Sequence, residues 1–312
     1  MAWSARDIPD QTGRVAVVTG GNGGLGLETV RELARKGARV VMAARNREKA
    51  ARAHAQVVAE LPEASIEVRA LDLGSLASVR AFGAEVLEAH AVIDLLFANA
   101  GVMATPEGTT VDGFETQFGT NHLGHFELTR LLLPALHRAG ADRVVTTTST
   151  ARFGAGPYDL DDPHHRRRRY EPCEAYGYAK LANLQFALEL DRRLRAAGSR
   201  VAAFSADPGL ARTDLQTTTA NQLPGRSQKL AEGMVRWIGQ SAAAGALDQL
   251  RAGTDPEAEG GTLYRPRWIA VGPPVVGGIG PRLRKPADLA KLWSLSEQEI
   301  GAAFDVPALA RA

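Results

Sequence analysis

The most informative pair of reactive side chains in the sequence is a tyrosine and a lysine four positions apart, Tyr176 and Lys180. On a helix this spacing places both side chains on one face, one turn apart. An ammonium group beside a phenol favours the phenolate, so it lowers the pKa of the tyrosine toward the working pH of an enzyme. Such a pair could exchange a proton with a substrate oxygen, although the same spacing is also common on ordinary helix surfaces.

A glycine-rich string near the N-terminus could hold a phosphate. Residues 19–26 read Thr-Gly-Gly-Asn-Gly-Gly-Leu-Gly and lie between a valine-rich run and a helical stretch. Glycines let backbone N–H groups approach a pyrophosphate, and a helix N-terminus adds partial positive charge. A glycine string alone is also typical of plain turns, but its place between a strand and a helix favours a dinucleotide site. The contacts expected there are Gly20, Asn22, Gly24, Leu25 and Gly26.

The end of the second predicted strand bears on the choice of cofactor. NAD sites usually offer an acidic residue there to the ribose hydroxyls, whereas this sequence has Ala44 followed by Arg45. A guanidinium group at this place could pair with a 2′-phosphate. The sequence therefore predicts NADP(H) in preference to NAD(H). The alternative is that Arg45 and Arg47 are solvated charges at the start of a helix.

Two further strand ends supply predicted cofactor contacts. Asp72 and Leu73 end the third strand, where the carboxylate could accept a hydrogen bond from the adenine amino group or cap the next helix. The small residues after the fourth strand would let a ribose pass close to the backbone. They are Asn99, Ala100 and Gly101.

These residues all follow strands in a regular alternation of strands and helices. Short apolar runs, several without polar alternation, predict strands that are buried on both faces. They lie at residues 14–19, 39–44, 65–70, 91–98, 143–148 and 200–205 and near 261–265. The alternation predicts an α/β fold of the Rossmann type, a doubly wound parallel sheet of about seven strands with helices on both faces. We interpret residues 1–312 as a single dinucleotide-binding domain.

Two irregular segments interrupt this alternation, at residues 151–173 and 210–256. Both follow the carboxyl ends of strands, where open α/β sheets bind ligands. We therefore expect an inserted loop and a substrate-covering segment. The simplest interpretation of the basic run from Arg166 to Arg169 is a solvated loop, and neither segment carries a motif that identifies a substrate.

Composition and charge exclude several classes of protein. The 312 residues are 45% hydrophobic and 23% charged, as in globular rather than disordered or collagen-like chains. A net charge of +2 gives no general reason to expect a nucleic-acid partner. The single cysteine, Cys173, suits a reducing compartment, and no window has the length of a membrane span or the pattern of a signal peptide. We expect a cytoplasmic protein without a metal site.

Together these motifs resemble those of the short-chain dehydrogenase/reductase family over nearly the whole chain. The resemblance rests on TGxxxGxG at residues 19–26, Asn-Ala-Gly at 99–101, YxxxK at 176–180 and a Pro-Gly pair after the sixth strand. The glycine spacing matches the compact oxidoreductase branch. The long separation of Ser149 from the tyrosine, and the helix that follows, resemble the retinol-dehydrogenase-like subgroup. One departure is Ala98, where the family often has a first asparagine.

The resemblance implies a set of four catalytic residues. Ser149 would donate a hydrogen bond to the substrate carbonyl, and Tyr176 would act as the acid or base. Lys180 would lower the pKa of Tyr176 and bind the nicotinamide ribose, and Asn121 would hold a relay water through its backbone. Tyr178 is a rival phenol, but it lies on the wrong helix face.

The same resemblance implies the remaining cofactor contacts and the reaction. The further contacts are Pro208, Gly209 and Thr213, and Tyr176 and Lys180 would also contact the cofactor. The reaction would be NADP(H)-dependent interconversion of a carbonyl and an alcohol by hydride transfer, on a small apolar substrate, and a homodimer or homotetramer is a further expectation. The alternatives are a non-catalytic NADP-binding scaffold or sensor, and a C=C reductase or redox-neutral cyclase that uses the same Tyr/Lys pair.

Overall fold

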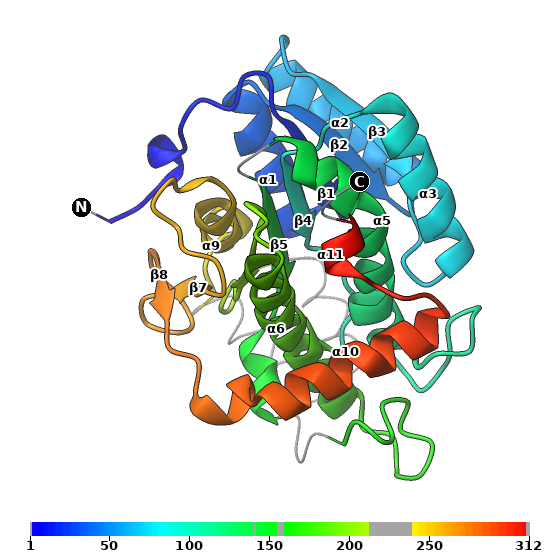
Figure 1. The fold of residues 1–312 in the computed structure, drawn as a ribbon. Helices are drawn as coiled ribbons and strands as arrows, with labels where there is room; N and C mark the ends of the chain where they lie inside the picture. The colour runs from blue at the N-terminus through cyan, green and yellow to red at the C-terminus, as the bar shows by residue number, and fades with distance from the viewer. Residues whose placement is uncertain (1, 140–141, 155–158, 212–238, 310–312) are drawn as a thin grey trace.

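The computed structural model describes residues 2–139, 142–154, 159–211 and 239–309. They form an α/β domain around an eight-stranded sheet with the order β3-β2-β1-β4-β5-β6-β7-β8 (Figure 1). All neighbouring strands are parallel except β7 and β8. The strands are β1 (Val15–Thr19), β2 (Arg39–Ala44), β3 (Ile66–Ala70), β4 (Leu95–Ala98), β5 (Arg143–Thr147), β6 (Ala202–Ala206), β7 (Leu263–Pro266) and β8 (Pro274–Gly277).

Helices join and cover these strands. The α-helices of the described residues are α1 (Gly24–Arg35), α2 (Arg47–Glu60), α3 (Leu76–Ala89), α4 (Thr116–Phe118), α5 (Gly124–Ala139), α6 (Pro172–Ala196), α9 (Ala242–Thr254), α10 (Pro286–Ile300) and α11 (Val306–Leu309). The shorter turns are the 3₁₀ segments η1 (Ala5–Asp7), η3 (Thr150–Gly154) and η4 (Pro281–Arg284), and the π-helical turn η2 (Gly119–Leu123).

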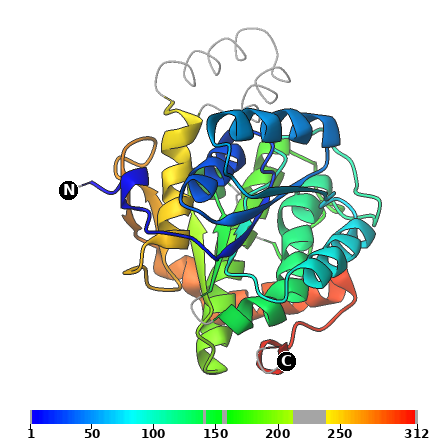
Figure 2. The same cartoon turned by 90° about the horizontal axis from the view of Figure 1, so that it is seen from above.

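Alternate residues of the central strands face opposite sides of the sheet, and helices bury both sides. Ala16 and Val18 of β1 belong to the buried cluster that includes α1, α2 and α9. Val17, between them, belongs to the cluster that includes α3, α5 and α6. Figure 2 shows the helices gathered on either side of the sheet. Because both faces of β1 need apolar contacts, its sequence has no polar alternation.

The doubly wound fold predicted from the sequence is confirmed, with one correction to the sheet. An eighth strand, β8, pairs antiparallel with β7 at the edge. It lies in a stretch rich in proline and glycine, which carries little strand signal, and proline is tolerated at an edge. Some bounds also differ: β4 begins at Leu95 rather than at residue 91, and β6 is shifted to Ala202–Ala206.

The C-terminal helices are part of the core rather than a tail. α10 and α11 pack on α6 (Figure 1). The Trp293 ring centroid lies 5.1 Å from that of Phe126 and 4.8 Å from that of Phe304. On its other side the Arg193 guanidinium is 4.2 Å from the ring centroid. The outer side of α6 is therefore covered by the chain's own C-terminal segment.

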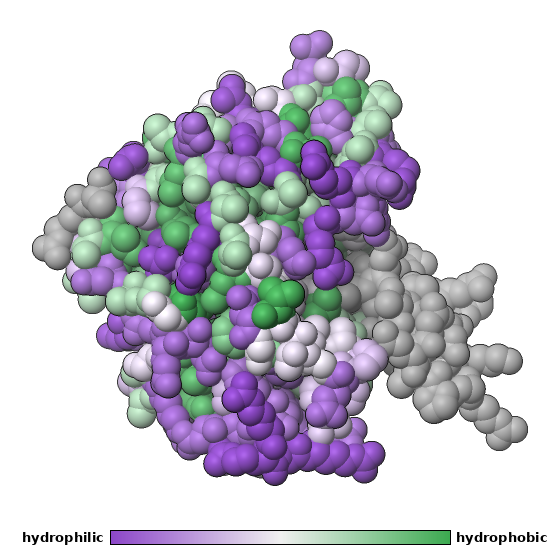
Figure 3. Space-filling view, turned by 90° about the vertical axis from the view of Figure 1, so that its right-hand side faces the viewer, coloured by the Kyte–Doolittle hydropathy of each residue, from purple (hydrophilic) through white to green (hydrophobic). Residues whose placement is uncertain are grey.

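The surface of the molecule is mixed. On the face shown in Figure 3, polar residues and small apolar areas are interspersed. Several large apolar side chains are exposed, Trp268 and the adjacent Ile269 among them, as is normal for a folded protein. No described helix is long and apolar enough to cross a membrane.

We predict that Trp293→Ala destabilises the fold by about 3–5 kcal/mol, because it removes a large side chain that is 2% exposed. Urea unfolding of the two proteins measures the difference. Trp268→Ala is the matched control: this tryptophan is 66% exposed, and its loss should change stability by no more than about 0.5 kcal/mol. Equal effects of the two substitutions would contradict a core role for α10.

Candidate active site

Tyr176 and Lys180 lie together on α6, as their spacing predicts. Both are buried, with 7% and 3% of their surfaces exposed. The Lys180 Nζ lies 5.6 Å from the centroid of the Tyr176 ring and donates a hydrogen bond to the Thr147 carbonyl, 3.0 Å away at the end of β5. Tyr178 is engaged elsewhere, because its hydroxyl accepts hydrogen bonds from the Asp159 N–H and from Arg168.

Burial dominates the protonation of this pair. It lowers the pKa of Lys180 to about 8, against a smaller raising effect from the Asp207 carboxylate. It also raises the pKa of Tyr176 well above its ordinary value, and a hydrogen bond with the Ser149 side chain only partly offsets this. The sequence predicted a lowered tyrosine pKa, but here the desolvation of the phenolate has the larger effect.

Ser149 lies beside Tyr176, just beyond the carboxyl end of β5. It follows β5 and immediately precedes η3. Its hydroxyl oxygen accepts a hydrogen bond from the Ala151 N–H at 3.2 Å, in addition to its contact with Tyr176. A substrate oxygen that meets the tyrosine hydroxyl would therefore lie within reach of the serine hydroxyl as well.

Asn121 occupies the π-helical turn η2 and uses all of its polar groups within the protein. Its side chain accepts a hydrogen bond from the Val102 N–H at 2.8 Å and donates one to the Val102 carbonyl at 2.9 Å. Its own carbonyl accepts from Nδ1 of His125 at 2.9 Å. A Cβ placed on Gly101 would be 3.0 Å from Asn121 Oδ1 and 3.5 Å from Lys180 Nζ. Asn121, Gly101 and Lys180 thus converge, as the sequence predicts.

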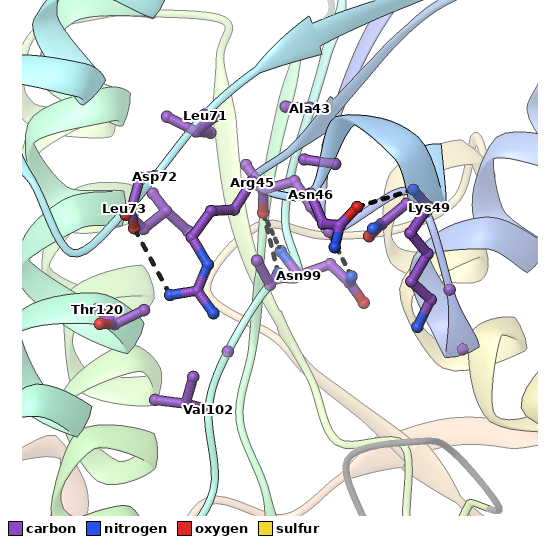
Figure 4. Close-up of a pocket in the computed structure, with 18 of the residues that line it drawn as sticks. Ala43, Arg45, Asn46, Lys49, Leu71, Asp72, Leu73, Asn99, Val102 and Thr120 are labelled. Carbon is purple, nitrogen blue, oxygen red and sulfur yellow. Dashed lines mark hydrogen bonds and ion pairs between the residues drawn. The ribbon is translucent and has the colours of Figure 1, made fainter. Parts of the chain in front are cut away.

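A cleft of about 420 Å³ lies at the carboxyl ends of β1, β2, β3 and β4 (Figure 4). Most of the predicted cofactor residues line it: Gly20, Asn22, Gly24, Leu25, Arg45, Asp72, Leu73, Asn99, Ala100 and Gly101. Gly26 stands behind this surface, where a Cβ would collide with the Gly20 carbonyl and approach Asn99 Nδ2 to 2.7 Å. The glycine at position 26 is therefore required by the close packing of the turn.

The turn is joined to β4 by hydrogen bonds. Thr19 Oγ1 accepts from the N–H groups of Asn99 and Ala100, at 2.9 and 3.0 Å, and Asn99 Nδ2 donates to the Thr19 carbonyl at 2.8 Å. These bonds fix the floor of the cleft before any ligand enters. Such prior ordering lowers the entropy that binding must remove.

The cleft has a cationic end that sequence reasoning found only in part. Arg45 was predicted, but Asn46 and Lys49 line the cleft too. Lys49 lies in the first turn of α2, which Asn46 caps directly after Arg45, and the predicted start of a helix at this point was the signal that could have found it. Figure 4 shows Arg45 extending toward Asp72, with 4.0 Å between Arg45 Nη1 and Asp72 Oδ1. That carboxylate also accepts from the Gly74 N–H at 3.0 Å, whereas Ser75 rather than Asp72 caps α3, and the predicted adenine contact of Asp72 stays a prediction.

The Pro-Gly turn after β6 lies next to the serine. Gly209 has a positive φ of 60°, and a Cβ there would collide with the Ala270 carbonyl, so glycine is required. Its N–H donates to Asp207 Oδ1 at 3.0 Å, and the carbonyl of Pro208 accepts from Gln240 at 2.9 Å. Thr213, and most of the predicted covering segment 210–256, lie outside the described residues.

The inserted loop makes more contacts with the rest of the protein than a solvated basic run would make. The solvated interpretation holds for Arg169, whose side chain is 90% exposed. It is wrong for Arg168, whose guanidinium packs 4.5 Å from the Tyr178 ring centroid and 3.5 Å from a Glu174 oxygen. Tyr170, at the end of the loop, bonds to Glu115 at 3.0 Å. No group of acidic, histidine or cysteine side chains in the described residues could hold a metal ion.

Comparison with known proteins identifies the family. A family model described as short chain dehydrogenase matches residues 14–159. Mouse polyprenol dehydrogenase is 40% identical over 258 residues, which cover 81% of this chain and 75% of that protein. The chain belongs to the short-chain dehydrogenase/reductase family.

Within this family, the retinol-dehydrogenase-like resemblance is also confirmed. Human retinol dehydrogenase 13 is 44% identical over 203 residues, 65% of this chain, and the match spans 60% of that relative's length. The crystal structure of a protein from Mycobacterium paratuberculosis superposes with a TM-score of 0.79 at 41% identity, covering 97% of this chain and 99% of that chain.

We predict that the buried ammonium of Lys180 makes the stability of this family member depend on pH. The folded-state pKa of about 8 lies below the ordinary lysine value of 10.5, so between these values the unfolded chain binds more protons and stability rises with pH. Denaturant unfolding at pH 7 to 10 should show this rise in the wild type and lose it in Lys180→Met. Lys285→Met, which removes an exposed lysine, is the control, and a rise that persists in Lys180→Met contradicts the assignment.

Proposed function

We propose that this chain is an NADP(H)-dependent oxidoreductase that interconverts a carbonyl and an alcohol. The observation that carries the proposal is the meeting of the buried Tyr176 and Lys180 with the half-buried Ser149 beside the glycine-lined cleft. The close-packed glycine turn and the bonded floor of the cleft fit a dinucleotide, because a side chain at Gly26 would collide with the Gly20 carbonyl and push apart the turn that lines the cleft. The bound cofactor would supply or accept the hydride.

The residues of the chain would handle the proton and orient the oxygen. The hydroxyls of Ser149 and Tyr176 would donate hydrogen bonds to the substrate carbonyl, which makes its carbon more electrophilic. As the alkoxide forms, Tyr176 would give up its proton to that oxygen. The ammonium of Lys180 would stabilise the resulting phenolate, which is otherwise disfavoured by burial. The reverse sequence of proton steps oxidises an alcohol.

The substrate class that we propose is an apolar carbonyl or alcohol. Two relatives carry the names retinol dehydrogenase and polyprenol dehydrogenase, and both names refer to largely hydrocarbon alcohols.

Self-association through the outer side of α6 is not part of the proposal, because α10 and α11 cover that side. A cytoplasmic location also remains a proposal, supported by the single cysteine.

Tyr176→Phe tests the reaction. We expect turnover of carbonyl substrates to fall by at least about 10³-fold, because the substituted ring has no proton to donate. The Kd for NADPH should stay within about twofold, since the phenol does not carry the cofactor's affinity. Tyr178→Phe is the matched control, and its turnover should remain near that of the wild type.

Activity, binding and product measurements together separate the proposed function from its alternatives. Full activity in Tyr176→Phe would refute the assigned role, and binding of NADPH without any turnover of a carbonyl panel by the wild type would favour the scaffold. Product analysis distinguishes reduction of C=O from reduction of C=C, and the absence of any change in NADPH absorbance during conversion would point to a redox-neutral cyclase.

The preference for NADP(H) over NAD(H) rests on the cationic end of the cleft. β2 ends at Ala44 rather than at a carboxylate, and both Arg45 and Lys49 line the cleft next to it. Asn46 caps α2 by accepting from the Lys49 N–H at 2.8 Å, so the N-terminus of this helix is also turned toward the cleft. A 2′-phosphate there would gain charge-assisted hydrogen bonds that NAD(H) has no group to form.

We therefore predict that Arg45→Ala and Lys49→Ala each weaken NADPH binding by about tenfold, the effect of one charge-assisted hydrogen bond. The Kd for NADH should change much less. Arg47→Ala, which removes the same charge from the same helix at a position that does not line the cleft, is the control. Titration of the cofactors by fluorescence measures all four proteins. Equal loss of NADPH and NADH affinity would overturn the NADP(H) assignment.

A further inference from the structure

A buried ion pair lies directly behind the serine. Arg152 in η3 and Asp207 after β6 are 6% and 0% exposed, and Nη1 of the arginine is 2.5 Å from Oδ2 of the aspartate. They are 55 positions apart in the chain. β5 and β6 bring them together, because these strands are parallel neighbours in which Thr147 pairs with Ala206.

Each partner of the pair also holds one of the two loops of the site. The same Nη1 of Arg152 donates to the Ser149 carbonyl at 2.7 Å. The other carboxylate oxygen of Asp207 accepts from the Gly209 N–H at 3.0 Å. A continuous chain of hydrogen bonds therefore runs from the serine loop to the Pro-Gly turn.

The pair is a poor device for stability alone. Removing two charges from water costs folding free energy, and apolar residues in such places often give equal or greater stability. Arg152 Nε has no hydrogen-bond partner among the described residues, although the guanidinium packs 4.4 Å from the Phe153 ring centroid. An incompletely satisfied pair that nevertheless joins two loops of the site points to a role in geometry.

We propose that Arg152 and Asp207 are positioning residues that hold Ser149 and the Gly209 turn in fixed register for the reaction. The proposal rests on the proposed function, in which Ser149 meets the substrate oxygen and the Gly209 turn meets the cofactor. Neither partner of the pair needs to touch a reactant. Their contribution is to keep two loops from different strands at the separation that hydride transfer requires.

The pair also brings charge to the proton-transferring residues. Among the described residues outside α6, four ionisable groups interact electrostatically with Tyr176, with Lys180 or with one another. They are Arg152 from η3, Asp207 after β6, Asp248 from α9 and His125 from α5. Burial and the nearby Asp207 raise the pKa of Asp248 to about 9, and burial lowers the pKa of His125 to about 4. Both are uncharged at neutral pH. Arg152 and Asp207 are the charged members of these four.

Asp207→Asn and Arg152→Met separate charge from fold. The Asp207 carboxylate raises the pKa of both Lys180 and Tyr176, so its removal lowers both. The alkaline fall of kcat/KM for carbonyl reduction should then move to lower pH, by on the order of one unit. Arg152→Met leaves the carboxylate unopposed and should move that fall in the opposite direction. Asp248→Asn removes a carboxyl group of the same cluster that is neutral below its pKa of about 9, so its kcat/KM at neutral pH should match the wild type.

The double variant Arg152→Met, Asp207→Asn tests position without an unpaired charge. Because it leaves neither charge alone in the interior, it should fold even if a single variant does not. We expect its kcat, per folded protein, to stay about 10- to 100-fold below the wild type, while the Kd for NADPH stays within about twofold. Arg152→Lys keeps the positive charge, so its kcat should lie between that of Arg152→Met and that of the wild type.

Two results would overturn the proposal. One is a double variant with wild-type kcat, which would show that the register of the loops does not depend on the pair. The other is an unshifted pH profile in both single variants. These failures are distinct from failure of the proposed function, because Tyr176→Phe would still abolish turnover if the function is right and the positioning role is wrong.

Discussion

The burial of the Lys180 ammonium is the constraint around which the site is arranged. An amine with 3% of its surface exposed is costly to charge, and its lowered pKa expresses that cost. The protein compensates with the Thr147 carbonyl at the end of β5 and with the Asp207 carboxylate after β6. Both groups come from carboxyl ends of parallel strands. The doubly wound sheet therefore supplies the environment that a charged lysine on α6 needs.

The sequence was sufficient for those parts that depend on local pattern. The spacing of Tyr176 and Lys180 defines their common helix face, and the glycine string at 19–26 needs only its own strand and helix to become the turn between β1 and α1. Continuous apolar runs identified most strands, because strands covered on both faces lose their polar alternation. The edge strand β8 was missed because it is short, begins with proline and is covered on fewer sides.

The parts that the sequence did not predict depend on contacts between distant positions. Arg152 and Asp207 have no common motif, and only the adjacency of β5 and β6 makes them a pair. Arg168 looks like one of four equivalent arginines in the sequence, yet it alone packs on Tyr178. The C-terminal segment has an apolar pattern, but nothing local shows that Trp293 completes the core beside Phe126. Tertiary packing decides each of these cases.

A second buried polar group, His125, shows how the nucleotide half and the reactive half are held together without charge. The Asn121 carbonyl can only accept, so Nδ1 of His125 carries the proton of that 2.9 Å bond. Nε2 then faces the Thr19 hydroxyl, 2.9 Å away, whose oxygen already accepts two backbone N–H groups and whose proton is shared between Nε2 and the Phe97 carbonyl at 3.2 Å. Protonation of the imidazole would turn this last acceptor into a donor and break the link. The lowered pKa of His125, about 4, keeps the ring neutral near neutral pH, so the connection between β1 and the π-helical turn is preserved.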